Sequence, residues 1–377
     1  MRVNIYQPRA SYYVGGAEVV ALQHAKYLAR AGYRVTLFTT KAAFIRPTGY
    51  FRSFVRENPA VDIRYISVPK SLAWIYKNPP GQDWERWDLE SLHVGRIASS
   101  VLESSQTPKS VFAAHNIIDS LALPPTASRV LHLHGHPDAL NYVCSLALQD
   151  PGLKLMAVSE MIRQKYASML PVRRGIQVAK NGIDAHHYTI LPNRHKKYDL
   201  LYVGRLIENK GVQVLIEALS ELEKAKHQKL QLAIAGAGPY KAKLQALVKS
   251  RKLQAQVNFL GFVPDGQLVR LYNSARLSVL PSLSKEGVLT TMLESCACGT
   301  PVLTSDQSSM REFVKNDKNS FLVPAGNAPV LARSIERIFL RGDGYINNVG
   351  LLAREQILRQ WTWERRIERV GALYESL

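Results

Sequence analysis

Short apolar runs alternate with amphipathic stretches along the whole chain. Continuous apolar runs of this kind are typical of strands buried on both faces of a parallel sheet. The stretches between them, such as 19–29, carry apolar residues at helical spacing and predict helices. This alternation predicts an α/β protein with two doubly wound, Rossmann-like domains. The predicted strands cover 3–6, 35–40, 111–114, 129–133, 155–158 and 176–179 in the first half, and 199–203, 230–235, 257–260, 277–280, 301–304 and 321–324 in the second.

A polar stretch at 186–197, which contains Pro192 and a basic run, separates the two sets of strands and is typical of a linker. We therefore predict a first domain over 1–184 and a second over 199–360. A chain of 377 residues is also too long for one typical core and suits two. Residues 361–377 predict a last helix.

The stretch from 282 to 301 has the pattern of an anion-binding helix end. After the strand at 277–280 and a loop to Gly287, a helix is expected from Thr290 or Thr291, with Thr291 and Glu294 as a capping box. First-turn N–H groups lack partners and attract a phosphate. Glu286 and Glu294 flank this helix end, and Glu294 would suit a ribose diol. The alternative is a capping Glu and a solvated loop Glu.

A second candidate phosphate site follows the strand at 199–203. Arg205 and Lys210 stand five residues apart in a loop that leads into a predicted helix. Two cations beside a helix start can hold a pyrophosphate and neutralise a departing phosphate. The spacing alone also fits ordinary surface charges.

Together these segments resemble the retaining glycosyltransferases of the GT-B fold, the sucrose-synthase-like and mannosyltransferase-like family four. The resemblance rests on Glu286-x7-Glu294, on the Gly-Thr-Pro-Val segment at 299–302 and on the Arg205/Lys210 pair, and it covers nearly the whole chain. It implies that Glu286 contacts the donor sugar and that Glu294 binds the ribose. It also implies two domains that face a central cleft, with the 361–377 helix packed back on the first, acceptor-binding domain.

Further site residues follow from the resemblance. The family has a His at a strand end near the donor sugar, and His134 is the preferred candidate, with His115 and His132 in reserve. The Gly15-Gly16 turn would reach into the cleft through Gly16, and the turn at Val263 would hold the base through its backbone. The expected catalytic set is His134, Glu286, Arg205 and Lys210, and the expected donor-binding set is Gly16, Arg205, Lys210, Val263, Glu286, Gly287, Leu289, Thr290 and Glu294.

The net charge of +19 is divided about evenly between the two halves of the chain. The positive electrostatic potential that this charge creates favours anionic partners, namely nucleotide sugars, phosphate-bearing acceptors or anionic lipid. No nucleic-acid-binding motif accompanies the charge, so no nucleic acid partner is expected. Aromatic and basic residues interleave at 44–56 and 72–77, which is a pattern suited to a membrane surface, although the aromatics could instead pack on the domain.

No metal is expected in the site. The chain has no Asp-x-Asp sequence, and three histidines within 132–136 lack a carboxylate or Cys that would complete a metal site. The three cysteines predict reduced thiols in a cytosolic protein. The apolar runs are too short to span a membrane, and the N-terminus enters a strand directly, so a cytoplasmic location, peripheral on the inner membrane face, is expected.

The resemblance thus implies a metal-independent, retaining hexosyltransferase. It would move a hexose from a nucleotide sugar, UDP-linked rather than GDP-linked, to a hydroxyl of a glycan, glycolipid or other acceptor in cell-surface polysaccharide or glycoconjugate synthesis. The nucleotide sugar is a co-substrate, and no cofactor is expected. Two alternatives stay open: a GT-B sugar-nucleotide epimerase, and a catalytically silent subunit that binds nucleotide sugar or glycan.

Overall fold

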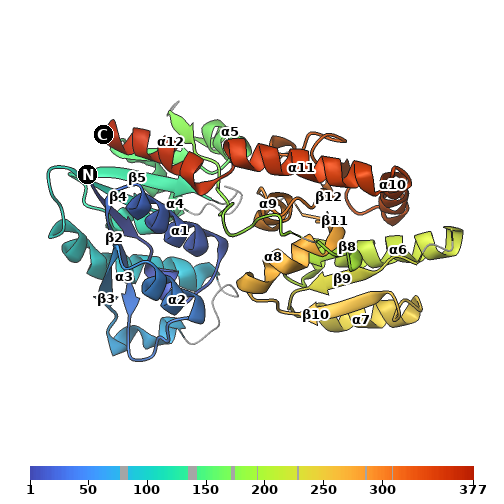
Figure 1. The fold of residues 1–377 in the computed structure, drawn as a ribbon. Helices are drawn as coiled ribbons and strands as arrows, with labels where there is room; N and C mark the ends of the chain where they lie inside the picture. The colour runs from blue at the N-terminus through green and yellow to red at the C-terminus, as the bar shows by residue number, and fades with distance from the viewer. Residues whose placement is uncertain are drawn as a thin grey trace. The chain divides into compact units, whose positions relative to one another are not determined.

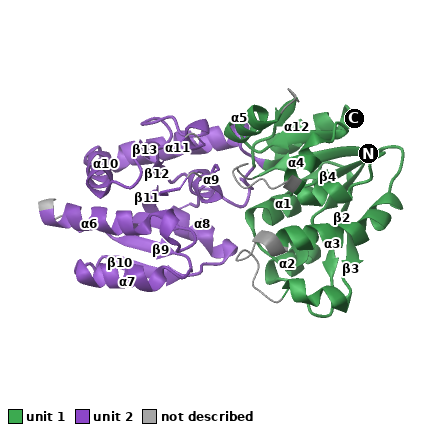
Figure 2. Ribbon diagram, turned by 180° about the vertical axis from the view of Figure 1, so that it is seen from behind, with its two compact units in different colours: residues 1–181, 363–377 green, residues 182–362 purple. Residues whose placement is uncertain are grey.

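The chain forms two compact units in the computed structural model. The structure describes residues 1–76, 84–134, 142–170, 175–192, 194–226, 229–284, 287–307 and 309–377. Unit 1 contains Met1–Asn181 and Trp363–Leu377, and unit 2 contains Gly182–Thr362 (Figure 2). The residues expected to form a linker therefore lie in unit 2.

Unit 1 is built on a seven-stranded parallel sheet with the order β3-β2-β1-β4-β5-β6-β7. Figure 1 labels β2, β3, β4 and β5 of this sheet. Its strands are β1 (Arg2–Tyr6), β2 (Arg34–Lys41), β3 (Val61–Ser67), β4 (Ser110–Ala114), β5 (Ser128–Leu133), β6 (Leu153–Ala157) and β7 (Ile176–Val178). Its helices are η1 (Pro8–Ser11), α1 (Gly16–Arg30), α2 (Gly49–Glu57), η2 (Lys70–Tyr76), α3 (Trp84–Glu103), η3 (Ile118–Ala122), α4 (Tyr142–Gln149), α5 (Glu160–Met169) and α12 (Trp363–Glu375).

The sequence pattern did not predict β3. This strand lies at the edge of the sheet, where Val61 and Ile66 are buried but Asp62 and Arg64 are exposed. An edge strand needs apolar residues on fewer positions than a central strand, so it shows no continuous apolar run.

The C-terminal helix α12 packs within unit 1, against α1. The Trp363 ring stacks on the Tyr27 ring with centroids 5.8 Å apart. Gly371 allows a close approach, because a Cβ at this position would lie 2.4 Å from the Tyr33 hydroxyl. The apolar face of α12, with Ile367 and Val370, shares a core with β1 and α1.

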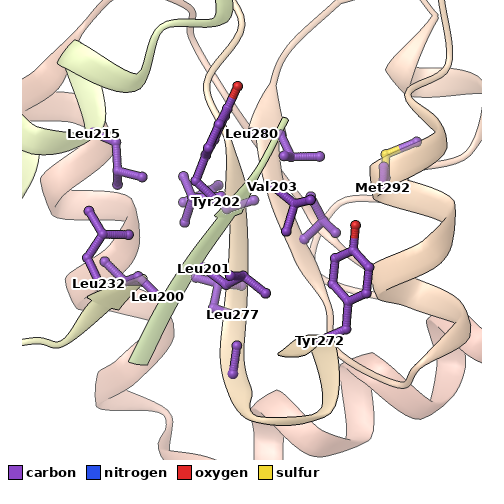
Figure 3. Close-up of a cluster of buried hydrophobic side chains, with 14 of the residues drawn as sticks. Leu200, Leu201, Tyr202, Val203, Leu215, Leu232, Tyr272, Leu277, Leu280 and Met292 are labelled. Atoms are coloured by element: carbon purple, nitrogen blue, oxygen red, sulfur yellow. The ribbon is translucent and has the colours of Figure 1, made fainter. Parts of the chain in front are cut away.

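Unit 2 has a six-stranded parallel sheet with the order β10-β9-β8-β11-β12-β13. Leu200, Leu201 and Leu277 belong to its core (Figure 3). The strands are β8 (Tyr198–Val203), β9 (Leu232–Ala235), β10 (Val257–Gly261), β11 (Ala275–Leu280), β12 (Val302–Ser305) and β13 (Phe321–Val323). The helices are η5 (Glu208–Lys210), α6 (Val212–Lys226), α7 (Lys241–Ser250), α8 (Asp265–Asn273), α9 (Thr290–Ala297), η6 (Met310–Glu312), α10 (Ala328–Leu340) and α11 (Gly342–Gln360).

Both sheets are doubly wound, which confirms the prediction of two Rossmann-like domains. The strand order reverses between β1 and β4 in unit 1 and between β8 and β11 in unit 2. In open parallel sheets, ligands bind beyond the carboxyl ends of the strands at such a reversal point. Within the described residues, no helix has the length and apolar character that crossing a bilayer requires.

Candidate active site

The loop after β8 carries Arg205 and Lys210 at the reversal point of unit 2. Arg205 is exposed, and Lys210 is half-buried at the end of η5. Gly211 follows in the left-handed region with φ of 72°, and a Cβ there would lie 1.9 Å from the Pro281 carbonyl oxygen. Glycine is therefore required where this loop passes the loop after β11.

Backbone hydrogen bonds also hold the Arg205 loop against the loop that follows β9. The N–H of Leu206 donates to the carbonyl of Ala237 at 2.9 Å, and the N–H of Tyr240 donates to the Leu206 carbonyl at 3.0 Å. Gly236 permits this contact, because a Cβ there would lie 1.8 Å from the Gly204 oxygen. The loop that carries the two cations is thus held between two neighbouring loops.

The loop after β11 lies beside the Arg205 loop. The Leu283 N–H donates to the Asn209 carbonyl at 2.8 Å. Gln307, after β12, donates its side-chain amide to the carbonyls of Ser282 and Ser284 at 3.2 and 2.6 Å. Gln307 could not be recognised in the sequence, because its contacts depend on the packing of β12 beside β11. Glu286 lies outside the described residues, so its predicted contact with the donor sugar stays a prediction.

Helix α9 begins two residues earlier than a capping box on Thr291 requires. Its N-cap is Leu289, with no side-chain capping bond, and Thr290 is already helical. The predicted capping box is therefore wrong, since both Thr291 and Glu294 lie inside the helix. Gly287 and Thr290 are exposed, while Leu289 is half-buried. An end without a side-chain cap leaves first-turn N–H groups for an anion.

Glu294 turns toward α8 instead of capping α9. The buried hydroxyl of Tyr272 donates to Glu294 Oε2 at 2.7 Å. Burial raises the pKa of Glu294 to about 7, and the Tyr272 hydrogen bond partly offsets that rise by favouring the ionised carboxylate. The structure thus provides a carboxylate at the helix start that changes charge near neutral pH. Tyr272 could not be recognised in the sequence, where it is one apolar position of a helix.

The turn after β10 carries Val263 at the same edge of the sheet. The Gly236 N–H donates to the Gly261 carbonyl at 2.7 Å, which ties this turn to the loop after β9. Val263 is half-buried, whereas Phe262 is 77% exposed. Arg205, Lys210, Val263 and Glu294 therefore all follow strands of one sheet at their carboxyl ends.

In unit 1, Gly16 and His134 lie on different elements. Gly16 is the exposed first residue of α1. His134 follows β5 and is half-buried, with its Nε2 2.8 Å from Nδ1 of His115. Burial lowers the pKa of His134 to about 3, so the ring is neutral at physiological pH.

His115 and His132, the two reserve candidates, lie in the interior with His24 of α1. The ligating atoms of these three buried rings lie within 4.8 Å of one another. However, the Arg366 guanidinium lies 3.3 Å from His132 Nδ1, and a buried cation beside neutral ligands opposes a metal ion. This geometry favours hydrogen-bonded rings over metal ligands.

A buried charge cluster lies at the reversal point of unit 1, and it could not be recognised in the sequence. Arg9, just after β1, is fully buried and pairs with Asp119 at 3.0 Å, with Glu90 at 3.6 Å and with Glu18 at 3.7 Å. Burial raises the pKa of each of the three carboxyls. The cluster joins η1, α1, α3 and η3, and its members come from distant parts of the chain.

Each half of the chain matches the model of a known glycosyltransferase family. Residues 14–187 match the family model described as Glycosyltransferase Family 4, and residues 188–345 match the model described as Glycosyl transferases group 1.

Curated relatives align with part of the chain. The putative colanic acid biosynthesis glycosyltransferase WcaL of Salmonella typhimurium is 25% identical over 59% of this chain and 56% of that protein. The amylovoran biosynthesis glycosyltransferase AmsK of Erwinia amylovora is 27% identical over the same shares. The chain thus spans a little over half the length of these relatives.

Among solved structures, Anabaena Alr3699/HepE in complex with UDP superimposes with a TM-score of 0.78 over 100% of both chains, at 18% identity. This likeness shows that the fold is GT-B.

Proposed function

The chain belongs to the group 1 glycosyltransferases, since the two family models together match residues 14–345, and we propose that it transfers a hexose from a nucleotide sugar to a hydroxyl group. UDP is the proposed nucleotide in preference to GDP, because a structure of the same fold holds UDP. The proposed acceptor is a glycan, glycolipid or other hydroxyl compound in cell-surface polysaccharide or glycoconjugate synthesis, which is the process in the names of two relatives.

One observation carries the proposal: two loops and a helix start converge at the reversal point of unit 2. The Leu283–Asn209 hydrogen bond keeps the loop of Arg205 and Lys210 beside the loop that leads to α9. In the proposal, the two cations and the helix end hold the diphosphate. Glu294, in its ionised form, accepts hydrogen bonds from the ribose hydroxyls.

This arrangement supports a mechanism in which stabilisation of the leaving group dominates. As the bond between sugar and phosphate breaks, negative charge grows on the diphosphate, and Arg205 and Lys210 counter that charge without a divalent ion. Glu286 and the neutral His134 contact the sugar in this proposal. The anomeric configuration is retained, and no metal or cofactor takes part.

We also propose that the chain associates with the inner face of an anionic membrane. The net charge of +19 supports an electrostatic attraction, and Trp74 in η2 is 42% exposed. Aromatic insertion by Phe51 and Phe54, which the sequence pattern suggested, is wrong, because both rings are buried in the core of unit 1. Basic residues of α2 and η2, with Trp74, remain to supply the contact.

The test is a screen of the full chain with UDP- and GDP-hexoses, followed by released nucleotide, with and without lipid-linked and soluble glycan acceptors. We expect UDP release that a suitable acceptor stimulates, and an α-linked product from an α-linked donor by NMR. An epimerised nucleotide sugar formed without acceptor would instead support the epimerase. Nucleotide-sugar binding with no turnover across the panel would support the silent subunit.

A further inference from the structure

Four histidines of unit 1 lie together near the carboxyl end of β5, and three of them form a hydrogen-bonded chain. His134 contacts His115 at 2.8 Å, and the other ring nitrogen of His115, Nε2, lies 3.2 Å from Nδ1 of His24. His132 stacks on His115 with ring centroids 4.6 Å apart and an angle of 12°. Apart from the half-buried His134, these rings are almost fully buried.

All four rings are neutral at physiological pH. Burial lowers the pKa of each ring, and the nearby Arg366 guanidinium lowers it further. A neutral imidazole has one N–H donor and one bare nitrogen acceptor. The chain His24–His115–His134 can therefore exist in only two forms, with every donor pointing outward to His134 or every donor pointing inward to His24.

The two forms differ at the buried end of the chain. In the inward form, His24 carries its proton on Nε2, which is buried and has no hydrogen-bond partner in the part of the chain that the structure describes. In the outward form, the same nitrogen is a bare acceptor. A buried donor without a partner is rarer in proteins than an acceptor without one, so the outward form is favoured.

His132 provides an internal contrast. Its Nδ1 faces Arg366 Nη2, at 3.3 Å, and a guanidinium can only donate. The proton of His132 therefore lies on Nε2, which faces the Tyr374 hydroxyl at 2.9 Å. Arg366 and Tyr374 of helix α12 thus fix His132 as the Nε2–H tautomer. The outward form of the His24–His115–His134 chain has the opposite tautomer, Nδ1–H.

We propose that His24 and His115 are positioning residues that hold His134 in the Nδ1–H tautomer, so that its outer nitrogen is a neutral hydrogen-bond donor. The substrate group beside His134 is then an acceptor oxygen, such as a sugar hydroxyl or ring oxygen, and not an ammonium group. His134 donates a hydrogen bond and does not act as a base. The contact of His134 with the donor sugar rests on the proposed function, whereas the tautomer does not.

The first experiment reads the tautomers directly. Long-range proton–nitrogen NMR of the full chain with ¹⁵N-labelled histidine distinguishes the protonated from the bare ring nitrogen. We expect Nδ1–H for His24, His115 and His134, and Nε2–H for His132 in the same sample. A proton on Nε2 of His134, or on both of its nitrogens, would overturn the proposal. This result needs no variant and no activity.

The second experiment separates a hydrogen-bonding role from a packing role. His24→Phe keeps an aromatic ring but removes the donor, whereas His24→Asn keeps an amide N–H near the position of Nδ1. We expect kcat/KM for the nucleotide sugar to fall about five- to tenfold in the Phe variant, with recovery in the Asn variant. The control is His93→Gln in α3, an exposed histidine, which should match the wild type.

The outcomes of the two experiments are distinguishable. If the Phe variant is the more active of the two, His24 acts through packing and the positioning role is refuted. If the wild type shows the expected tautomers but transfers no sugar to any acceptor, the proposed function fails and the tautomer assignment stands.

Discussion

The ionisation of Glu294 should make donor binding depend on pH near neutrality. The pKa of this carboxyl is about 7, because burial disfavours its charge. Ribose hydroxyls are donors, so the ionised carboxylate is the form that binds. At pH 6 about a tenth of the molecules carry that form, and the apparent Kd should be about tenfold weaker than at pH 8.

The assay is calorimetric titration with UDP-glucose, because its diphosphate has no group that titrates in this range. Glu294→Gln should bind UDP-glucose weakly, and its Kd should lack the roughly tenfold change between pH 6 and pH 8 that the wild type shows. Tyr272→Phe should move the midpoint to higher pH, because the Tyr272 hydrogen bond lowers the Glu294 pKa. Equal pH dependence in wild type and Glu294→Gln would refute the assignment of Glu294 to the ribose.

The raised pKa of Glu294 also makes the stability of the folded protein depend on pH, in a direction that can be stated. The folded protein holds the Glu294 proton more tightly than the unfolded chain, whose carboxyl has the ordinary pKa of 4.5. The stabilisation is therefore complete below about 4.5 and is lost as the pH rises through about 7. In the absence of ligand, the Tm of the wild type should fall relative to Glu294→Gln across this window.

Three further predictions concern the charges of the chain. Arg205→Ala or Lys210→Ala should lower kcat by about 30- to 1,000-fold, since each removes about 2–4 kcal/mol of leaving-group stabilisation. The matched control is Arg251→Ala, which removes an exposed arginine of unit 2 that pairs with Glu217. Turnover should survive EDTA, and loss of activity that Mg²⁺ or Mn²⁺ restores would contradict the metal-free mechanism. In vesicle flotation, binding should require anionic lipid, fade with salt, and weaken in Arg52→Glu and Arg56→Glu by about 1 kcal/mol per arginine. If the protein does not bind anionic vesicles at low salt, the result would instead support a soluble, phosphate-bearing acceptor as the partner of the basic surface.

Several features of this protein are determined by its sequence alone. Parallel strands buried on both faces need continuous apolar runs, and these runs appear in the sequence without reference to any partner segment. The elements of the candidate donor site are also local, since Arg205 and Lys210 lie in one loop and Glu294 lies one turn into one helix. The fold and the donor-site candidates could therefore be predicted.

Other features were decided only by the tertiary structure. Tyr272 and Glu294 belong to different helices, and the pKa of Glu294 depends on its burial between them and, to a smaller extent, on their hydrogen bond. The histidine chain joins α1 to the ends of β4 and β5, and the cluster around Arg9 joins four elements. Phe54 of α2 resembles a membrane-facing residue in the sequence but lies in the core. Which side chains face one another, and which lose water, depends on how distant segments pack, and a local pattern of residues does not contain that information.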